Sequence, residues 1–138
     1  PDVATLAGFG AACARAGALL AAMPDVARRR DRLERALVAR GAVVNGAGGP
    51  RVATVTDVSV PGWRGARLVA ALDLEGLCAS SGPACSSGVD APSAVVAAMY
   101  PDEPWRAESA LRLSLSAETS DAEIDEAIAI LARVLDRR

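Results

Sequence analysis

The apolar residues of the chain recur with helical spacing near both ends and with strand spacing between them. Residues 3–40 are mostly strong helix formers, and Pro24 interrupts them. We therefore predict one helix that ends near Met23 and a second from Asp25 to Arg40, or a single kinked rod.

Segments in the middle of the chain have the composition or the alternation of β-strands. Val43 and Val44 can start a strand, and residues 51–60 are rich in Val and Thr, which predicts another. Residues 110–115 alternate strictly, so that Arg112 points away from a face of leucines. The apolar faces of these last two strands are predicted to carry Val52, Val58 and Val60, and Leu111, Leu113 and Leu115.

The remaining segments predict further helices and one short strand. Residues 64–75 are expected to form a helix and residues 77–79 a strand, and Pro92 suits the first turn of a short helix. Ser120 and Glu123 have the spacing of a capping box that opens a last helix. The inward positions of these helices are Leu68, Val69 and Leu72, and Ile124, Ile128, Leu131 and Leu135. The order of elements predicts an α+β fold, in which a small, mostly antiparallel sheet packs against helices.

Length and charge narrow the class of protein. With 138 residues the chain is expected to form one domain over residues 1–138. Its longest apolar stretch, residues 16–23, is shorter than the ~20 residues that span a bilayer, so we predict no membrane and no secretory segment. The net charge of −2 argues against a nucleic-acid partner, and the basic run at residues 28–30 is interpreted as a solvated helix face. Because Pro1 is not an initiator methionine, we expect an artificial boundary or a proteolytic cut before it.

The chain lacks several reactive residue types. Its three cysteines, Cys13, Cys78 and Cys85, are an odd number without a C-x-x-C pair, which indicates a reducing compartment such as the cytoplasm, and neither a disulfide framework nor a metal site. Histidine is absent, and every basic residue is an arginine. The chain therefore has no His general base and no lysine for a Schiff base. We expect Cys78 and Cys13 to be buried, and Trp63 and Trp105 to cap the core.

Residues 80–88 are the segment most suggestive of chemistry. Cys85 has only small neighbours and lies between Gly82 and Gly88, as an accessible sulfur-carrying thiol would require. The alternative is a Ser/Gly surface turn with an incidental cysteine. The segment reads Ser80, Ser81, Gly82, Pro83, Ala84, Cys85, Ser86, Ser87, Gly88.

The same segment resembles the S-S-G-x-A-C-[ST]-S active-site loop of the cysteine desulfurases. Residues 111–115 resemble the R-x-S-L strand of that family, residues 118–125 the start of its last helix, and residues 1–4 the segment after its Gly-Thr pair. Together these four segments extend over essentially the whole chain. The chain therefore resembles the C-terminal small domain of a cysteine desulfurase, in the class-V aminotransferase family of fold-type I enzymes that use pyridoxal phosphate (PLP).

The resemblance implies a mechanism and a set of partners. A large domain absent from this chain would hold PLP on a lysine, so no cofactor is expected on residues 1–138 and the fragment is predicted to be inactive alone. Arg112 would bind the carboxylate of the substrate L-cysteine, and Cys85 would take its sulfur as a persulfide, with release of alanine. The loop residues around Cys85 would be Ser80, Ser81, Gly82, Ala84, Ser86 and Ser87. Cys85 would pass the sulfur to an iron–sulfur scaffold or a thiolation partner, and the parent enzyme would be a homodimer.

Two alternatives remain open from the sequence. The chain is also compatible with the small domain of another class-V aminotransferase relative, although such enzymes need no loop cysteine like Cys85. It is further compatible with a sulfur carrier or assembly module without catalysis, which the absence of lysine and histidine would suit.

Overall fold

The computed structural model describes residues 2–82 and 91–137, which form five helices and three strands. The N-terminal part consists of helix α1 (Val3–Val38) and strands β1 (Val43–Val44) and β2 (Val55–Ser59). The helices α2 (Gly65–Leu74), α3 (Ala94–Met99) and α4 (Pro104–Glu108) follow. Strand β3 (Ala110–Ser114) and helix α5 (Asp121–Leu135) complete the order. The predicted α+β class is confirmed.

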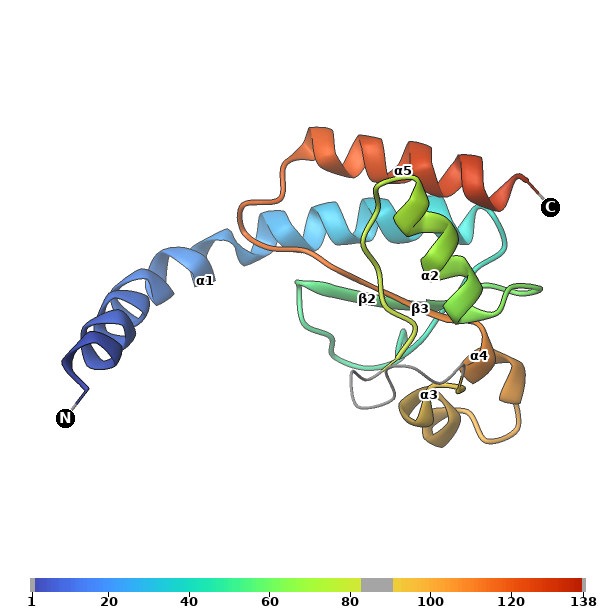
Figure 1. Cartoon of the computed structure of the whole chain (residues 1–138), viewed down its shortest axis with the longest axis horizontal. Helices are drawn as coiled ribbons and strands as arrows, with labels where there is room; N and C mark the ends of the chain where they lie inside the picture. Colours follow the sequence, from blue (N-terminus) through green and yellow to red (C-terminus); the bar gives the residue numbers. More distant parts are fainter. Residues whose placement is uncertain (1, 83–90, 138) are drawn as a thin grey trace.

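Helix α1 is a single helix that continues through Pro24, so the alternative of one rod is the correct one. Figure 1 shows that it bends and that its N-terminal part extends away from the rest of the molecule. By length and composition alone α1 could cross a membrane, a criterion that core helices and signal sequences also meet. The prediction made from its longest uninterrupted apolar stretch did not anticipate this property.

The sheet is antiparallel and has the strand order β1-β2-β3. Leu111 pairs with Val58 and Leu113 with Thr56, and all four side chains are buried on one face. Since direct partners in an antiparallel pair share a face, the pair of Asp57 and Arg112 lies on the other. The predicted separation of Arg112 from the leucines is thus confirmed.

The leucine face is covered by the C-terminal half of α1 and by α2, and α5 packs against both of these helices (Figure 1). Leu33 and Leu37 of α1 and Leu68 of α2 join the same buried cluster as the sheet leucines. On the opposite face Val96, Ala107 and Ala110 form a small second cluster at one end. Among residues 2–82 and 91–137, the Asp57–Arg112 end of that face has no comparable buried cluster over it.

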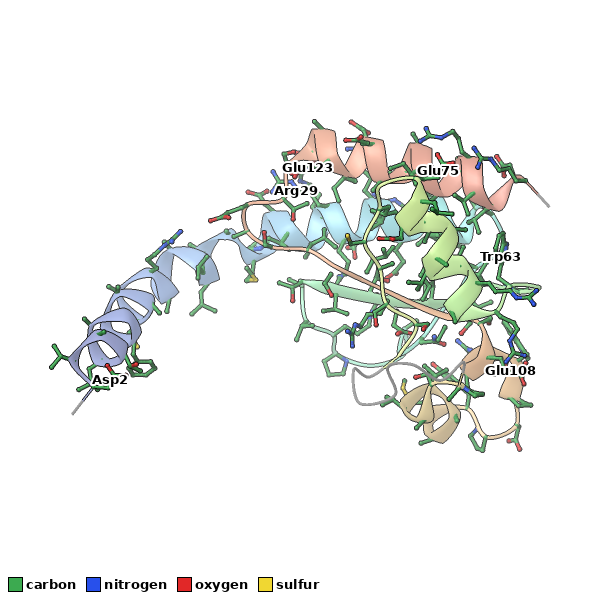
Figure 2. The ribbon with its side chains drawn as sticks, in the orientation of Figure 1. Asp2, Arg29, Trp63, Glu75, Glu108 and Glu123 are labelled. Carbon is green, nitrogen blue, oxygen red and sulfur yellow. The ribbon has the colours of Figure 1, made fainter. Side chains whose placement is uncertain are left out.

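The basic run of α1 joins two helices. Asp121 of α5 accepts from Arg28 and from Arg29 (3.3 and 3.2 Å), and Arg32 pairs with Asp125. Figure 2 shows Arg29 beside the start of α5, near Glu123. Arg30 is buried, and its guanidinium donates a hydrogen bond to the carbonyl oxygen of Val52 (2.6 Å). The interpretation as a solvated face is therefore only partly correct.

Five predicted details are wrong. Strand β2 begins at Val55, and Val52 is exposed in the preceding loop. Residues 77–79 form no strand, and Cys78 is exposed because its neighbours Leu77 and Ala79 are the ones that pack on the core. Cys13 is exposed as well, as are the residues around it in the N-terminal part of α1. Pro92 precedes the N-cap Ser93 of α3 and is not in its first turn.

Candidate functional site

The candidate site is built on the Asp57–Arg112 pair at the open end of the sheet. These residues occupy opposite positions of β2 and β3, and the Arg112 side chain is exposed. Within residues 2–82 and 91–137 its guanidinium makes no ion pair, and it interacts with the Asp57 carboxylate through space. An arginine in this state has its planar fork of donors available for a carboxylate or a phosphate.

A cavity of about 190 Å³ opens beside this pair. Arg112, Asp57 and Asn45 supply one side, and Val96 and Met99 of α3 supply an apolar side. Gly82 and Ser93 also line it. Among the described lining residues, one cation, one carboxylate and a few apolar side chains form a site suited to a small zwitterion such as an amino acid.

Asn45 holds the carboxylate of Asp57 in place. Its Nδ2 donates to Asp57 Oδ1 (2.6 Å), and its backbone N–H donates to the Asp57 carbonyl oxygen (2.8 Å). Asn45 Oδ1 in turn accepts from Nε of Arg106 (3.1 Å), which is only 6% exposed and stacks on the Tyr100 ring at 3.6 Å. The position of Asp57 is therefore set by a buried network that begins in α4.

Burial raises the pKa of Asp57, while the hydrogen bond from Asn45 and the positive charge of Arg112 act in the opposite direction and offset only part of the effect. The cause is the loss of water around the charged form. A carboxylate in this position is thus electrostatically costly, and Arg112 is the cation that compensates it from within the cavity.

The segment Ser80–Gly82, which precedes the undescribed residues 83–90, is held by backbone pairing between Ser80 and Arg112. Ser80 N–H donates to the Arg112 carbonyl oxygen (3.1 Å), and Arg112 N–H donates to the Ser80 carbonyl oxygen (2.6 Å). Ser80 Oγ then donates to the Gly82 carbonyl oxygen (2.9 Å). The chain returns at Ser93, which is buried and donates its N–H to the Ala107 carbonyl oxygen (2.9 Å). Gly82 and Ser93, on either side of the undescribed segment, border the same cavity.

The predicted site residues divide into two groups. Arg112, Ser80, Ser81 and Gly82 are described, and the structure brings Arg112 next to Ser80 and Gly82. The other predicted residues, Ala84, Cys85, Ser86 and Ser87, lie outside the described residues.

Asp57, Asn45 and Ser93 were not predicted as site residues from the sequence. Asp57 could have been found as a lone charged residue within a strand of Val and Thr. No role was predicted for Asn45, and no local signal links it to residue 57. Its contribution depends on the pairing of β1 with β2.

Comparison with known proteins shows relatives of one kind. The chain is similar to a cysteine desulfurase of Klebsiella pneumoniae, at 36% identity over 139 residues, and the match covers 99% of this chain and 34% of that protein. A cysteine desulfurase of Bradyrhizobium diazoefficiens is 38% identical over 109 residues, with 78% of this chain and 28% of that protein covered. The chain thus spans about a third of the length of the curated relatives it matches. No protein-family model matches it.

Among solved structures, the fold is similar to a NifS-like protein of Rickettsia africae ESF-5, with a TM-score of 0.67, 17% identity, and 83% of this chain and 29% of that one covered. Another NifS-like protein gives a TM-score of 0.63 at 24% identity, with 83% of this chain and 27% of that one covered. The architecture therefore defines a small α+β domain of the NifS-like type. In sequence the chain is a relative of the cysteine desulfurases over most of its length, and it is consistent with the C-terminal domain of such an enzyme.

Proposed function

We propose that this chain is the C-terminal part of a PLP-dependent cysteine desulfurase, that Arg112 binds the substrate carboxylate, and that Cys85 receives the sulfur. The observation that carries the proposal is the pairing of Ser80 with Arg112 beside the cavity. The pairing brings Ser80, the first residue of the segment that resembles the desulfurase active-site loop, beside the strand that resembles the R-x-S-L strand of that family.

In the proposed reaction, Arg112 binds the carboxylate of L-cysteine with its planar fork and so fixes the orientation of the substrate. The Cys85 thiolate attacks the substrate sulfur, and an S–S bond forms while the Cβ–S bond of the substrate breaks. The electron pair of the broken bond remains on carbon, which takes up a proton to give alanine. Cys85 then carries the sulfur as a persulfide.

The residues of this chain do not supply a PLP site of their own. The sequence contains no lysine for a Schiff base and no histidine, so another part of the parent protein would hold the cofactor. When bound there, PLP would supply the electron withdrawal that weakens the bonds of the substrate amino acid. What this chain contributes is the carboxylate-binding arginine and the sulfur-accepting thiol.

The exposed part of α1 supports a parent with a further domain. Leu6, Phe9, Cys13 and Leu20 recur at intervals of three, four and seven residues, which places them on one stripe of the helix. Phe9 is 69% exposed and Leu20 is 71% exposed. A stripe of this kind is typical of a helix whose apolar partner is missing. We propose that the remaining two thirds of the parent, judged by its relatives, include the PLP-binding domain that covers it.

The acceptor of the sulfur and the compartment are also proposals. A persulfide must be passed on, so we propose an iron–sulfur scaffold or a thiolation protein as the partner. Cys85 must be a free thiol before each sulfur transfer, and because thiols stay reduced in the cytoplasm, we propose that compartment.

The test compares the full-length parent with its Cys85→Ala variant, and measures alanine release from L-cysteine and the mass of the protein. The parent should release alanine and gain about 32 Da, roughly one sulfur atom, on the nucleophilic thiol. The Cys85→Ala variant should do neither. Matched controls are Cys13→Ala and Cys78→Ala, which should keep both properties because these cysteines lie outside the site. A PLP-loaded parent that releases no alanine would refute the desulfurase function.

A further inference from the structure

Asp57 has features that packing of the domain does not require. Its backbone belongs to β2, where its neighbours Thr56 and Val58 supply the buried face, while its own side chain lies on the other face beside the cavity. There it is held by Asn45 at 2.6 Å, and burial makes its charge costly. An uncharged residue in the same position would avoid that cost.

We propose that Asp57 is a positioning residue that holds the Arg112 guanidinium over the cavity, so that the fork of Arg112 is directed at the carboxylate of an amino-acid substrate. This inference deepens the proposed function and rests on it. The structural basis is a series of polar side chains that runs from Arg106 through Asn45 and Asp57 to Arg112. Hydrogen bonds link Arg106 to Asn45 and Asn45 to Asp57. The charges of Asp57 and Arg112 interact through space.

The arrangement explains why Asp57 does not simply neutralise Arg112. One edge of a guanidinium can interact with a fixed carboxylate while the remaining donors stay available to a second one. Asn45 restrains the Asp57 carboxylate, and within the described residues no ion pair closes between Asp57 and Arg112. The negative charge therefore restricts the positions of a long, exposed side chain without blocking its donors. A ligand carboxylate that enters the cavity then meets an arginine with less conformational entropy to lose.

The backbone of Arg112 adds to the same effect. Both its N–H and its carbonyl oxygen are paired with Ser80, so the main chain at residue 112 is held from β2 on one side and from Ser80 on the other. The freedom that remains at this position is in the side chain. Asp57 is the charged group on the described part of the cavity wall that can limit it.

The experiment is a double-mutant cycle in the full-length parent, with Asp57→Asn, Arg112→Gln and the two combined. Two quantities are measured for each: the KM and kcat for L-cysteine from alanine release, and the Kd of the unreactive ligand L-alanine by calorimetry. Asp57→Asn is expected to raise KM and Kd by about threefold to tenfold, as for coupled neighbouring residues, with kcat changed less than about twofold. In the Arg112→Gln background, Asp57→Asn should not change KM or Kd any further.

Two controls accompany the cycle. Asp73→Asn removes a carboxylate from the exposed side of α2 and should leave KM and Kd unchanged. Asp57→Ser supplies a second neutral variant, and thermal unfolding of each protein shows which of them are folded.

The outcomes separate the two hypotheses. An unchanged or lower KM and Kd in the Asp57→Asn variant would overturn the positioning role, as would an equal change with and without Arg112. Such results would leave the proposed function intact if the parent still releases alanine and Arg112→Gln still weakens L-alanine binding. If the parent releases no alanine at all, the proposed function fails, and the L-alanine Kd values alone decide whether Asp57 positions Arg112.

Discussion

Gly65 lies where three segments of the molecule meet, at the first residue of α2. A Cβ atom at this position would lie 2.5 Å from the Ala110 carbonyl oxygen and 2.9 Å from the Cβ of Ser81. The first of these is a backbone atom, which cannot move away without shifting the start of β3. The absence of a side chain at Gly65 therefore lets α2, β3 and the Ser80–Gly82 segment approach one another closely.

We predict that Gly65→Ala lowers the free energy of unfolding by about 1–3 kcal/mol, the usual cost of overpacking. Urea denaturation of the 138-residue chain would measure the change. The matched control is Gly17→Ala in α1, where an added Cβ meets no atom within 4 Å. That substitution should instead stabilise the helix, by roughly 0.5–1 kcal/mol. If both substitutions changed the free energy of unfolding equally, the close approach at Gly65 would make no contribution to stability.

At the scale of elements, α1 is attached to the sheet through Glu34. Its carboxylate accepts from Arg51 (2.7 Å) and from the Thr56 hydroxyl (2.8 Å), which ties α1 to the loop before β2 and to β2 itself. Burial alone would raise the pKa of Glu34, but the hydrogen bonds from Arg51 and Thr56 outweigh it, and the net direction is below the ordinary value of 4.5.

From this direction we predict a pH-dependent effect of Glu34→Gln. The pKa of Glu34 is lower in the folded state than its unfolded value of 4.5, so its charged form stabilises the folded protein at pH values above 4.5. This contribution is lost as the pH falls through the pKa of Glu34 in the folded state. Glu34→Gln should therefore cost about 1–2 kcal/mol at pH 7, and less below about pH 4.5. Urea unfolding at pH 7 and at pH 4 would show the difference. The exposed Glu126→Gln in α5 serves as the control, and a cost that stays constant with pH would contradict the role of the charge.

The elements that the sequence predicted well are those whose signals are local. The alternation around Arg112 and the capping box at Ser120 and Glu123 depend on neighbouring residues, and both occur in the structure. Helix α4 was not predicted, because it has only five residues, from Pro104 to Glu108, and they carry no periodic pattern. Val52 and Cys78 were misplaced because strand composition does not determine where pairing begins.

The candidate site shows the same limit. Arg112 and Ser80 were named from short motifs, whereas Asp57 and Asn45 belong to the site only through the register of three strands. Register is a non-local property, since it depends on which residues become opposed when the strands pair.

At the scale of the whole molecule, the chain has two parts of different character. One part contains a continuous apolar core, which is buried between the sheet and the helices α1, α2 and α5. The other is the N-terminal part of α1, which Figure 1 shows extending beyond that core. The Asp57–Arg112 cavity lies on the opposite side of the sheet from the core. A partner that covers the apolar stripe of α1 would therefore contact a part of the helix that lies outside the core.

If the stripe normally has a covering domain, the isolated 138-residue chain should self-associate through it. Burial of a large apolar side chain contributes about 1.5–3 kcal/mol, so three such residues supply enough for association at moderate concentration. We predict that light scattering shows a mass that rises with concentration, and that the combined substitutions Leu6→Gln, Phe9→Gln and Leu20→Gln keep the chain monomeric. Glutamine is a good helix former, so α1 should persist. Leu74→Gln in α2 also removes an exposed leucine, but it lies off the stripe and should leave association unchanged. A wild-type chain that stays monomeric at every concentration would mean that the stripe needs no covering partner, and the argument for the missing domain would then rest on the length of the relatives alone.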